Sequence, residues 1–202
     1  MKKSFLTLAF VMALAVSTAS AAMKKSKAPS YTGVIKANPL GLALGYFNAS
    51  YELPVGPSAG LNLSGNYYSY GSGFYKLSGF GAGGMYRFYS KGKGKNLNSF
   101  YYGPMLSFAS VTWTWDYGSF YGGTEKYKSS LFIFAPGFGL GRQWIFNGGF
   151  TLDLGGGIVY YVAGTAEFKD SNGNVIAGAA VPSAFSSIWP AAWFSLGYAF
   201  GK

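Results

Sequence analysis

Hydrophobic and polar residues alternate with a period of two along most of this chain. The longest example covers residues 150–168, where one parity carries Phe, Leu, Leu, Gly, Ile, Tyr, Val, Gly, Ala and Phe. The other parity includes Thr151, Asp153 and Glu167. Because successive side chains of a β-strand point to opposite faces, we predict a strand with one apolar and one mixed face. The segment is far longer than an ordinary strand of roughly 5–6 residues, which favours a strand that crosses a membrane and projects beyond it.

The alternation predicts seven antiparallel strands from residue 46 onward, and the even strand number of bacterial barrels calls for an eighth upstream. They cover residues 32–42, 46–53, 58–70, 74–89, 99–115, 129–146, 149–168 and 187–200. An alternative for the start of the chain is one long bent strand over residues 33–53. Apolar residues occupy both faces of segments 99–115 and 129–146, so the register of these two strands stays open. Pro104 and Pro136 indicate bulges or local breaks in their ladder.

The predicted connections are of two kinds. Residues 53–58 and 146–149 are tight turns, and Asn147-Gly148 is a strong hairpin signal. Residues 90–98 form a longer polar turn, whereas 116–129 and 169–187 are long and rich in Gly, Ser, Asp and Asn. Short turns at one end and long loops at the other are typical of outer-membrane barrels.

The N-terminal residues predict a cleavable signal peptide over residues 1–21. Two lysines precede an apolar run over residues 5–16, and Ala19-Ser20-Ala21 completes the three-part pattern of a secretory signal. The run is shorter than the ~20 residues that a spanning helix needs. We expect residues 22–30 to be a basic tail with Lys24, Lys25 and Lys27, and residues 31–202 to be one domain.

The rest of the chain contains no apolar stretch long enough for a spanning helix. In hydrocarbon every backbone polar group must find a partner within the protein, so a closed barrel is the remaining way to span a membrane. The predicted fold class is therefore all-β: a single transmembrane antiparallel up-and-down β-barrel of eight strands. The alternative is a secreted soluble sandwich, which would seldom keep an alternating pattern over so long a segment.

Composition supports a membrane location and disfavours catalysis. Only 11% of the residues are charged, against roughly 25% in an ordinary soluble domain. Aromatic residues make up 20% of the chain, which disfavours intrinsic disorder. The chain has no Cys and no His, and therefore lacks thiolate ligands, disulfides and the usual general base. We expect no enzyme activity, no cofactor and no metal, although a Ser-Lys or carboxylate-only mechanism stays open in principle.

Four charged residues within the predicted strands are candidate lumen charges: Glu52, Arg87, Arg142 and Asp153. Their parity predicts that Glu52, Arg87 and Asp153 point inward. Arg142 shares the parity of Phe138 and Leu140, so we expect either a bulge that turns it inward or a position at the membrane interface. The charges form either a polar pore or an ion-pair network that fills the interior, and eight strands leave just enough room for the second.

Aromatic and basic residues lie near the predicted connections. A candidate aromatic girdle or outer-loop surface contains Trp113, Trp115, Tyr117, Phe120 and Tyr121. Lys91, Lys93 and Lys95 form a basic turn, which we expect to be solvated or to meet lipid phosphates. Two of the 16 lysines and arginines lie in the signal peptide, so the exported chain stays basic against 6 acids. Nucleic acid is not an expected partner of an exported barrel.

These features resemble the small eight-stranded outer-membrane barrels of Gram-negative bacteria over residues 31–200. Residues 34–42, VIKANPLGL, followed by 49–53, ASYEL, are similar to the opening of an uncharacterised barrel family. Tyr198 and Phe200 resemble the terminal aromatic signal that the outer-membrane assembly machinery recognises, although Gly201 and Lys202 follow. The resemblance implies an outer-membrane location, with the assembly machinery and outer-membrane lipids, including lipopolysaccharide, as partners. It implies no particular activity.

We therefore expect a non-enzymatic outer-membrane protein with a structural or surface-interaction role. The alternative is a narrow channel or a carrier for small or hydrophobic solutes, with a small hydrophobic ligand held by the glycine-lined wall near Val159 and Tyr161. A third interpretation is an enzyme that acts on envelope lipids, which the absence of histidine disfavours.

Overall fold

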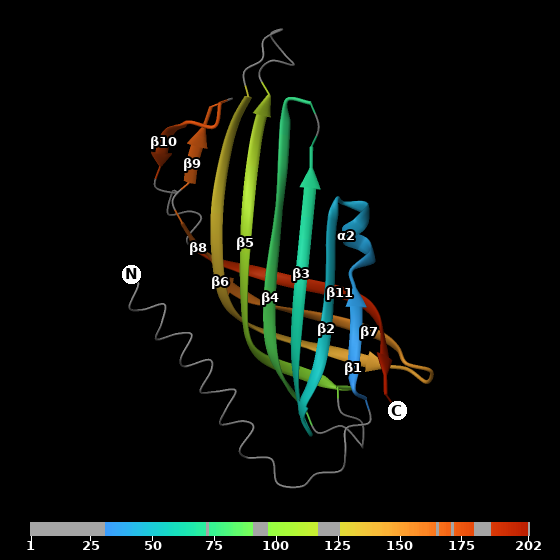
Figure 1. Ribbon diagram of the computed structural model, residues 1–202. Helices are drawn as coiled ribbons and strands as arrows, with labels where there is room; N and C mark the ends of the chain where they lie inside the picture. The colour runs from blue at the N-terminus through green and yellow to red at the C-terminus, as the bar shows by residue number, and fades with distance from the viewer. Residues whose placement is uncertain are drawn as a thin grey trace.

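The computed structural model describes residues 31–71, 73–90, 97–116, 126–164, 166–170, 172–179 and 187–201. Within them lie one short helix and a single antiparallel sheet (Figure 1). The elements are β1 (Gly33–Ala37), α2 (Pro39–Ala43), β2 (Tyr46–Gly56), β3 (Ala59–Tyr70), β4 (Tyr75–Tyr89), β5 (Phe100–Asp116), β6 (Lys126–Ile145), β7 (Phe150–Tyr160), β8 (Val162–Ala163), β9 (Ala166–Lys169), β10 (Val175–Ala179) and β11 (Ile188–Phe200). The predicted signal peptide and basic tail, residues 1–30, lie outside the described residues.

The sheet closes on itself. Each strand from β1 to β7 pairs with the next along the chain, β7 pairs with β11, and β11 returns to β1. At the closure Gly33 lies opposite Phe200 and Ala37 lies opposite Leu196. We call this closed sheet the ring. Every predicted strand segment contributes a strand to it, so the prediction of a single antiparallel sheet is confirmed.

The two ends of the ring differ. The β2–β3 and β6–β7 connections and the C-terminus lie at one end, which we call the turn end (Figure 1). The opposite end, the loop end, carries α2 and the β3–β4 connection. There β4, β5 and β6 extend past the rest of the ring (Figure 1). Residues 117–125 of the predicted loop 116–129 and residues 91–96 of the predicted turn 90–98 lie outside the described residues, and residues 126–129 belong to β6 rather than to the loop.

The first predicted strand is correct only in its first half. Residues 33–37 form β1, but Pro39–Ala43 is a helix. The Asn38 side chain accepts a hydrogen bond from the Gly41 amide at 3.0 Å, and Pro39 follows it. An asparagine N-cap with proline in the first turn is a helix-start signal, which explains why the strand ends here. The alternative of one bent strand over 33–53 is wrong, because β1 and β2 pair antiparallel.

The segment 149–168, predicted as one strand, pairs along β6 but is interrupted twice. β7 and β8 follow β6 in the same register, from Ile145 opposite Thr151 to Ile133 opposite Ala163. The pairing breaks at Tyr161 and again after Ala163, and β9 resumes with its register shifted by one residue. A single uninterrupted strand was therefore the wrong prediction, while its direction and partner were right.

Part of the predicted loop 169–187 is ordered as a hairpin. β10 pairs antiparallel with β9, and the turn between them is organised by Asp170. Its Oδ1 accepts hydrogen bonds from the Asn172 amide at 2.9 Å and the Asn174 amide at 2.8 Å. Asp side chains that bind the backbone two residues on are common turn formers.

We expect this turn to loosen in acid. Hydrogen bonds from the Asn174 and Asn172 amides lower the pKa of Asp170 below its ordinary value of 3.8. A carboxyl with a lowered folded-state pKa stabilises the fold above its unfolded pKa, and this stability is lost as the pH falls through the folded value. In an NMR titration the Asn174 amide should shift with a midpoint below 3.8. Asp170→Asn should abolish that step, and a midpoint at or above the ordinary value would contradict the assignment.

The two prolines do not insert a residue into the ladder. β5 and β6 pair without a shift from Phe100 opposite Arg142 to Asp116 opposite Lys126. Pro104 lies opposite Phe138, and Pro136 lies opposite Leu106, within this constant register. The predicted bulges at these prolines are therefore wrong, but the predicted local breaks occur in the ladders on their other side. The β4–β5 pairing skips from Met85 opposite Met105 to Phe88 opposite Tyr102, past Pro104. Beyond Gly137 opposite Val159, β6 forms no pair at Pro136 before Phe134 opposite Val162. The register that the sequence left open is settled by pairing along the whole length of both strands.

Candidate functional site

Four charged side chains meet inside the ring, and each comes from a different strand. We call Lys36 (β1), Glu52 (β2), Arg87 (β4) and Asp153 (β7) the ion-pair cluster; none is more than 3% exposed. Lys36 Nζ donates to Glu52 Oε2 at 2.6 Å and to Asp153 Oδ2 at 2.8 Å. Arg87 Nη1 donates to the same two oxygens at 3.0 and 2.7 Å. Two cations thus alternate with two carboxylates, and the formal charges cancel.

Two tyrosines occupy the remaining carboxylate oxygens. The Tyr89 hydroxyl donates to Glu52 Oε1 at 2.5 Å, and the Tyr101 hydroxyl donates to Asp153 Oδ1 at 2.5 Å. The Arg87 guanidinium lies 4.0 Å from the centre of the Tyr101 ring. Buried charges are tolerated only when partners replace the water that they lose. With all four carboxylate oxygens bound, the cluster meets this requirement and ties opposite sides of the ring together.

Gln143 connects the ion-pair cluster to the turn end. Its Oε1 accepts from Lys36 Nζ at 2.8 Å, and its Nε2 donates to the Leu97 carbonyl at 2.9 Å. Leu97 is fully buried and has a φ of 63°, in the left-handed region that disfavours residues other than glycine. Tyr31, Val34 and other apolar side chains pack with Leu97 in the buried core of this end. The interior is therefore filled at the turn end.

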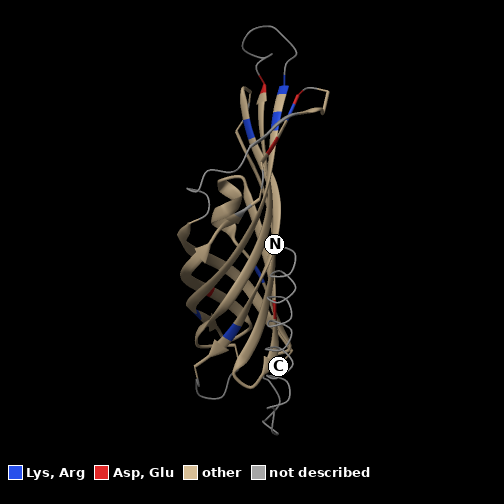
Figure 2. Cartoon of the chain, turned by 90° about the vertical axis from the view of Figure 1, so that its left-hand side faces the viewer, with Lys and Arg blue, Asp and Glu red and all other residues tan. Residues whose placement is uncertain are grey.

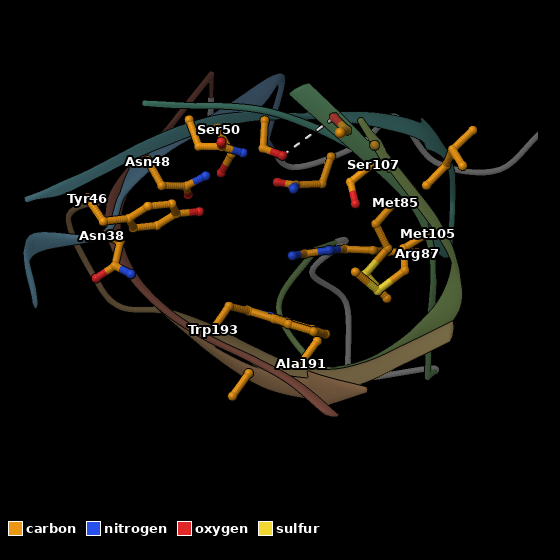
Figure 3. A pocket seen from close by; sticks show the side chains of 17 residues that line it. Asn38, Tyr46, Asn48, Ser50, Met85, Arg87, Met105, Ser107, Ala191 and Trp193 are labelled. Atoms are coloured by element: carbon orange, nitrogen blue, oxygen red, sulfur yellow. Dashed lines mark hydrogen bonds between the residues drawn. The ribbon is translucent and has the colours of Figure 1, made fainter. Parts of the chain in front are cut away.

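Towards the loop end, the interior contains a cavity of about 250 Å³. One wall is polar, with asparagine and serine side chains that include Asn48 and Ser50 (Figure 3). The other wall is mainly apolar, with Met85, Met105 and Trp193. Arg87 is the member of the ion-pair cluster that lines the cavity. Neither carboxylate of the cluster lines it.

The structure brings together three of the four candidate lumen charges. Glu52, Arg87 and Asp153 all belong to the ion-pair cluster. Sequence reasoning missed Lys36, which completes the cluster, and Gln143, which supports it. The signal for Lys36 was present, because it lies between Ile35 and Ala37 in a segment predicted to alternate. Gln143 carries no charge and therefore did not stand out.

Arg142 lies outside the ion-pair cluster. It shares the outward parity of Phe138 and Leu140, and no bulge turns it inward, since the pairing on both sides is regular. Its guanidinium lies 4.6 Å from the Phe100 ring centre and 5.1 Å from the Trp144 ring centre. Of the two expectations for this residue, the inward turn is wrong, and the outer position near the turn end is the one observed.

The candidate aromatic girdle is not on the outer face where the structure describes it. Trp113 and Trp115 have the same parity on β5 as Tyr101 and Val111, which are buried inside. Strand alternation therefore places both tryptophans on the inner face, in the part of β5 that extends past the ring. Tyr117, Phe120 and Tyr121 lie outside the described residues.

A different set of aromatic side chains forms a row on the outer face. The register places Phe47 opposite Tyr67, Tyr67 opposite Phe80, and Phe80 opposite Ser110, which lies opposite Phe132. All four aromatic residues are exposed, from 46% for Phe47 to 66% for Phe80. We call them the aromatic row. Alternation along each strand predicts that these four side chains point outward. Only the register between the strands places them at the same height on the ring.

Two polar rows follow the aromatic row towards the loop end. The first is made of hydroxyl residues, in which Ser78 lies opposite Ser69 and Thr112, and Thr112 lies opposite Ser130. The next is basic, in which Lys76 and Lys128 lie on either side of Thr114, and Lys128 lies opposite Lys169. The outer face thus changes from aromatic to hydroxyl to cationic within three successive rows.

The aromatic row forms the loop-end edge of an apolar belt on the outer face. The belt covers residues 47–55, 59–67, 80–88, 100–108 and 132–140 on β2 to β6, and its outward positions are apolar or glycine throughout. Many of these side chains are exposed, among them Leu63, Phe88, Tyr102 and Phe138. At the turn end Arg142 follows the belt on β6. This outer face is more apolar than that of an ordinary soluble domain.

The predicted assembly signal lies on the outer face of β11. Tyr198 and Phe200 are both exposed, and the Phe200 ring stacks on Tyr51 at 6.0 Å between centroids. A side chain at Gly33 would collide with both rings of this stack. Their position beside β1 therefore depends on ring closure.

Among the described residues, no helix has the length and apolar character needed to cross a membrane. The described part of the chain also contains no group of three or more acidic residues that could hold a metal ion. Comparison of the chain with protein-family models, curated proteins and solved structures gives no match.

Proposed function

We propose that the ring is an eight-stranded transmembrane β-barrel in the outer membrane of a Gram-negative bacterium, with a structural or surface-interaction role and no enzymatic activity. The observation that carries this proposal is the inverted polarity of the ring. Charged side chains are fully buried inside it, whereas large apolar side chains are exposed around its outside. A surface of this kind is stable when hydrocarbon rather than water surrounds it.

The width of the apolar belt supports the proposal independently. On each strand from β2 to β6 the belt covers nine residues, and on β2, β3, β4 and β6 this count includes the aromatic row at its edge. A tilted transmembrane strand needs about 9–11 residues to cross the hydrocarbon core. From the aromatic row at the edge of the belt, the hydroxyl row and the basic row then follow in the order in which a bilayer changes from hydrocarbon to interface to charged head group.

The same rows support an orientation. In outer-membrane barrels the short turns face the periplasm and the longer loops face outward. The basic row, with Lys76 and Lys128, would then lie at the head groups of the outer leaflet, where lipopolysaccharide phosphates are the expected partners. Charged residues gather at the loop end, beyond the belt, and in the part of the ring nearest the turn end (Figure 2). The other proposed partner is the assembly machinery, through Tyr198 and Phe200, and nucleic acid is not proposed.

The filled turn end favours a structural or surface role over transport. Leu97, Tyr31 and the ion-pair cluster leave their part of the interior almost inaccessible to water. The second candidate is a narrow channel or carrier, which the polar cavity at the loop end favours. For a solute to pass, the cluster and the packing around Leu97 would both have to open.

Fractionation and reconstitution test the proposal together. The full chain, expressed in a Gram-negative host, should be recovered in the outer membrane without residues 1–21. The purified protein should need detergent or lipid to stay folded and monomeric. A folded monomer in plain buffer would contradict the membrane location. In planar bilayers we expect no single-channel steps, and well-resolved steps would favour the channel over the structural role.

A further inference from the structure

Two buried polar atoms at the cavity have no hydrogen-bond partner among the described residues. They are Asn62 Oδ1 and Arg87 Nε. Both residues line the cavity and are more than nine-tenths buried. They come from neighbouring strands, since Asn62 lies opposite Met85 and Arg87 lies opposite Gly60. Buried polar groups in native proteins are nearly always paired, so this pair of atoms indicates a missing partner.

The two atoms define the chemistry of that partner. Asn62 Oδ1 is an acceptor, and Arg87 Nε carries a hydrogen to donate. A hydroxyl group can serve both, because it donates one hydrogen bond and accepts others. An ionic ligand is not favoured, because Arg87 is the only charged residue among the described residues that line the cavity, and its charge is balanced within the ion-pair cluster.

The polar wall offers further groups to a ligand with several hydroxyls. Asn48 Nδ2 donates to the Gly65 carbonyl at 3.3 Å, and Ser107 Oγ donates to the Ala135 carbonyl at 3.4 Å. Because the Ser107 hydrogen and one Asn48 amide hydrogen are directed at the strand backbone, Ser107 Oγ and Asn48 Oδ1 offer acceptors to the cavity. A ligand that donates several hydrogen bonds fits this wall.

The opposite wall offers a flat apolar surface. The Trp193 ring lies along this wall (Figure 3). Its indole N–H donates to the Tyr101 hydroxyl at 2.6 Å, which fixes the ring. Side chains at Gly139 or Gly155 would collide with the indole, so these glycines let it lie flat against the wall. Aromatic faces pack well against the C–H face of a ring-shaped ligand. Polar groups on one side and a fixed aromatic ring on the other match a molecule with the same two faces.

The cavity volume limits the ligand to a small one. About 250 Å³ is below the roughly 300–1,000 Å³ of pockets for drug-sized ligands. It is also several times the ~30 Å³ that one water occupies, so a single bridging water would not fill it. We propose that this cavity binds a neutral polyhydroxylated ring of monosaccharide size. Its hydroxyls bind Asn62, Arg87 and the polar wall, and its apolar face packs on Trp193.

Binding of D-glucose to the purified full-length protein tests the proposal. Saturation-transfer NMR is measured in a detergent without a sugar head group, because such a head group would compete. We expect saturable binding of D-glucose, and none of inorganic phosphate or cyclohexane. Binding of phosphate or cyclohexane without glucose would overturn the ligand class, and binding of none of the three would mean that the cavity holds water only.

Matched variants locate the site. Asn62→Leu should weaken glucose binding by about tenfold or more without lowering thermal stability, since it removes an unpaired buried acceptor. Asn147→Leu, at an exposed turn residue, should leave binding unchanged. Trp193→Phe should weaken binding, and Trp144→Phe, on the outer face, should not.

Equal binding by Asn62→Leu and the wild type would overturn the proposal. The cavity belongs to the ring wherever the ring resides, so this failure would leave the proposed membrane location intact.

Discussion

Replacing Glu52 by glutamine is expected to lower the free energy of unfolding by about 3–5 kcal/mol, the usual cost of breaking a buried ion pair by removing one partner. Glu52 is fully buried and accepts hydrogen bonds from Lys36, Arg87 and Tyr89. In Glu52→Gln the two cations share the single carboxylate of Asp153, so the interior carries an unbalanced positive charge. Urea unfolding from lipid vesicles, followed by tryptophan fluorescence, measures the loss.

Glu167→Gln is the matched control. Glu167 forms a 3.2 Å ion pair with Lys169, and both side chains are exposed. Exposed pairs contribute about 0–1 kcal/mol, so this change should have little effect. Adding Lys36→Met to Glu52→Gln should recover part of the stability, because it restores charge balance. Equal losses for Glu52→Gln and Glu167→Gln would contradict the structural role of the ion-pair cluster.

Neutralising the other carboxylate separates a structural role from a pore. Asp153→Asn should destabilise the protein for the same reason as Glu52→Gln. It should leave planar-bilayer conductance unchanged, because Leu97 and Tyr31 still fill the turn end. Conductance that changes in Asp153→Asn without loss of heat stability would instead identify the cluster as part of a solute path.

An arginine in the centre of the apolar belt is expected to cost about 2–4 kcal/mol, as it does at the midplane of membrane barrels. Leu63 lies in the middle of the belt segment 59–67 on β3 and is 46% exposed. In water, Leu63→Arg would replace one exposed side chain by another and change stability by no more than roughly 0.5 kcal/mol. In lipid it forces a charge into hydrocarbon. Unfolding from vesicles therefore distinguishes the two environments directly.

Leu44→Arg is the control for this experiment. Leu44 caps the C-terminal end of α2 at the loop end, outside the belt, and is 73% exposed. It should tolerate arginine with little loss of stability in the same vesicles. If Leu63→Arg is also tolerated, the belt does not contact hydrocarbon, and the membrane proposal fails.

Much of the interior was predictable, because the direction of a strand side chain follows from parity alone. Asp153 lies between Leu152 and Leu154, and Glu52 lies between Tyr51 and Leu53, so each was assigned to the inner face. The closed antiparallel sheet was likewise predictable from the spacing of alternating segments and turns. The helix start at Asn38-Pro39 is a local signal too, and the strand predicted over residues 32–42 runs through it.

The partners of these side chains were not predictable. Lys36 reaches Asp153 across 117 positions of sequence, and it does so only because β11 joins β1 to β7 around the ring. The aromatic row, too, exists only through the pairing of four strands. The misplacement of Trp113 and Trp115 shows the same limit, because proximity to a predicted loop does not say which face a residue occupies.

The sequence by itself determined which residues face inward, which face outward and where the strands turn, since alternation and turn chemistry are local properties. Only the tertiary structure decided the register between strands. Register sets which inward charges meet, at what level the outer rows lie, and where the interior is filled or hollow. It depends on turn lengths, packing and closure of the whole ring at once, so no single segment contains it.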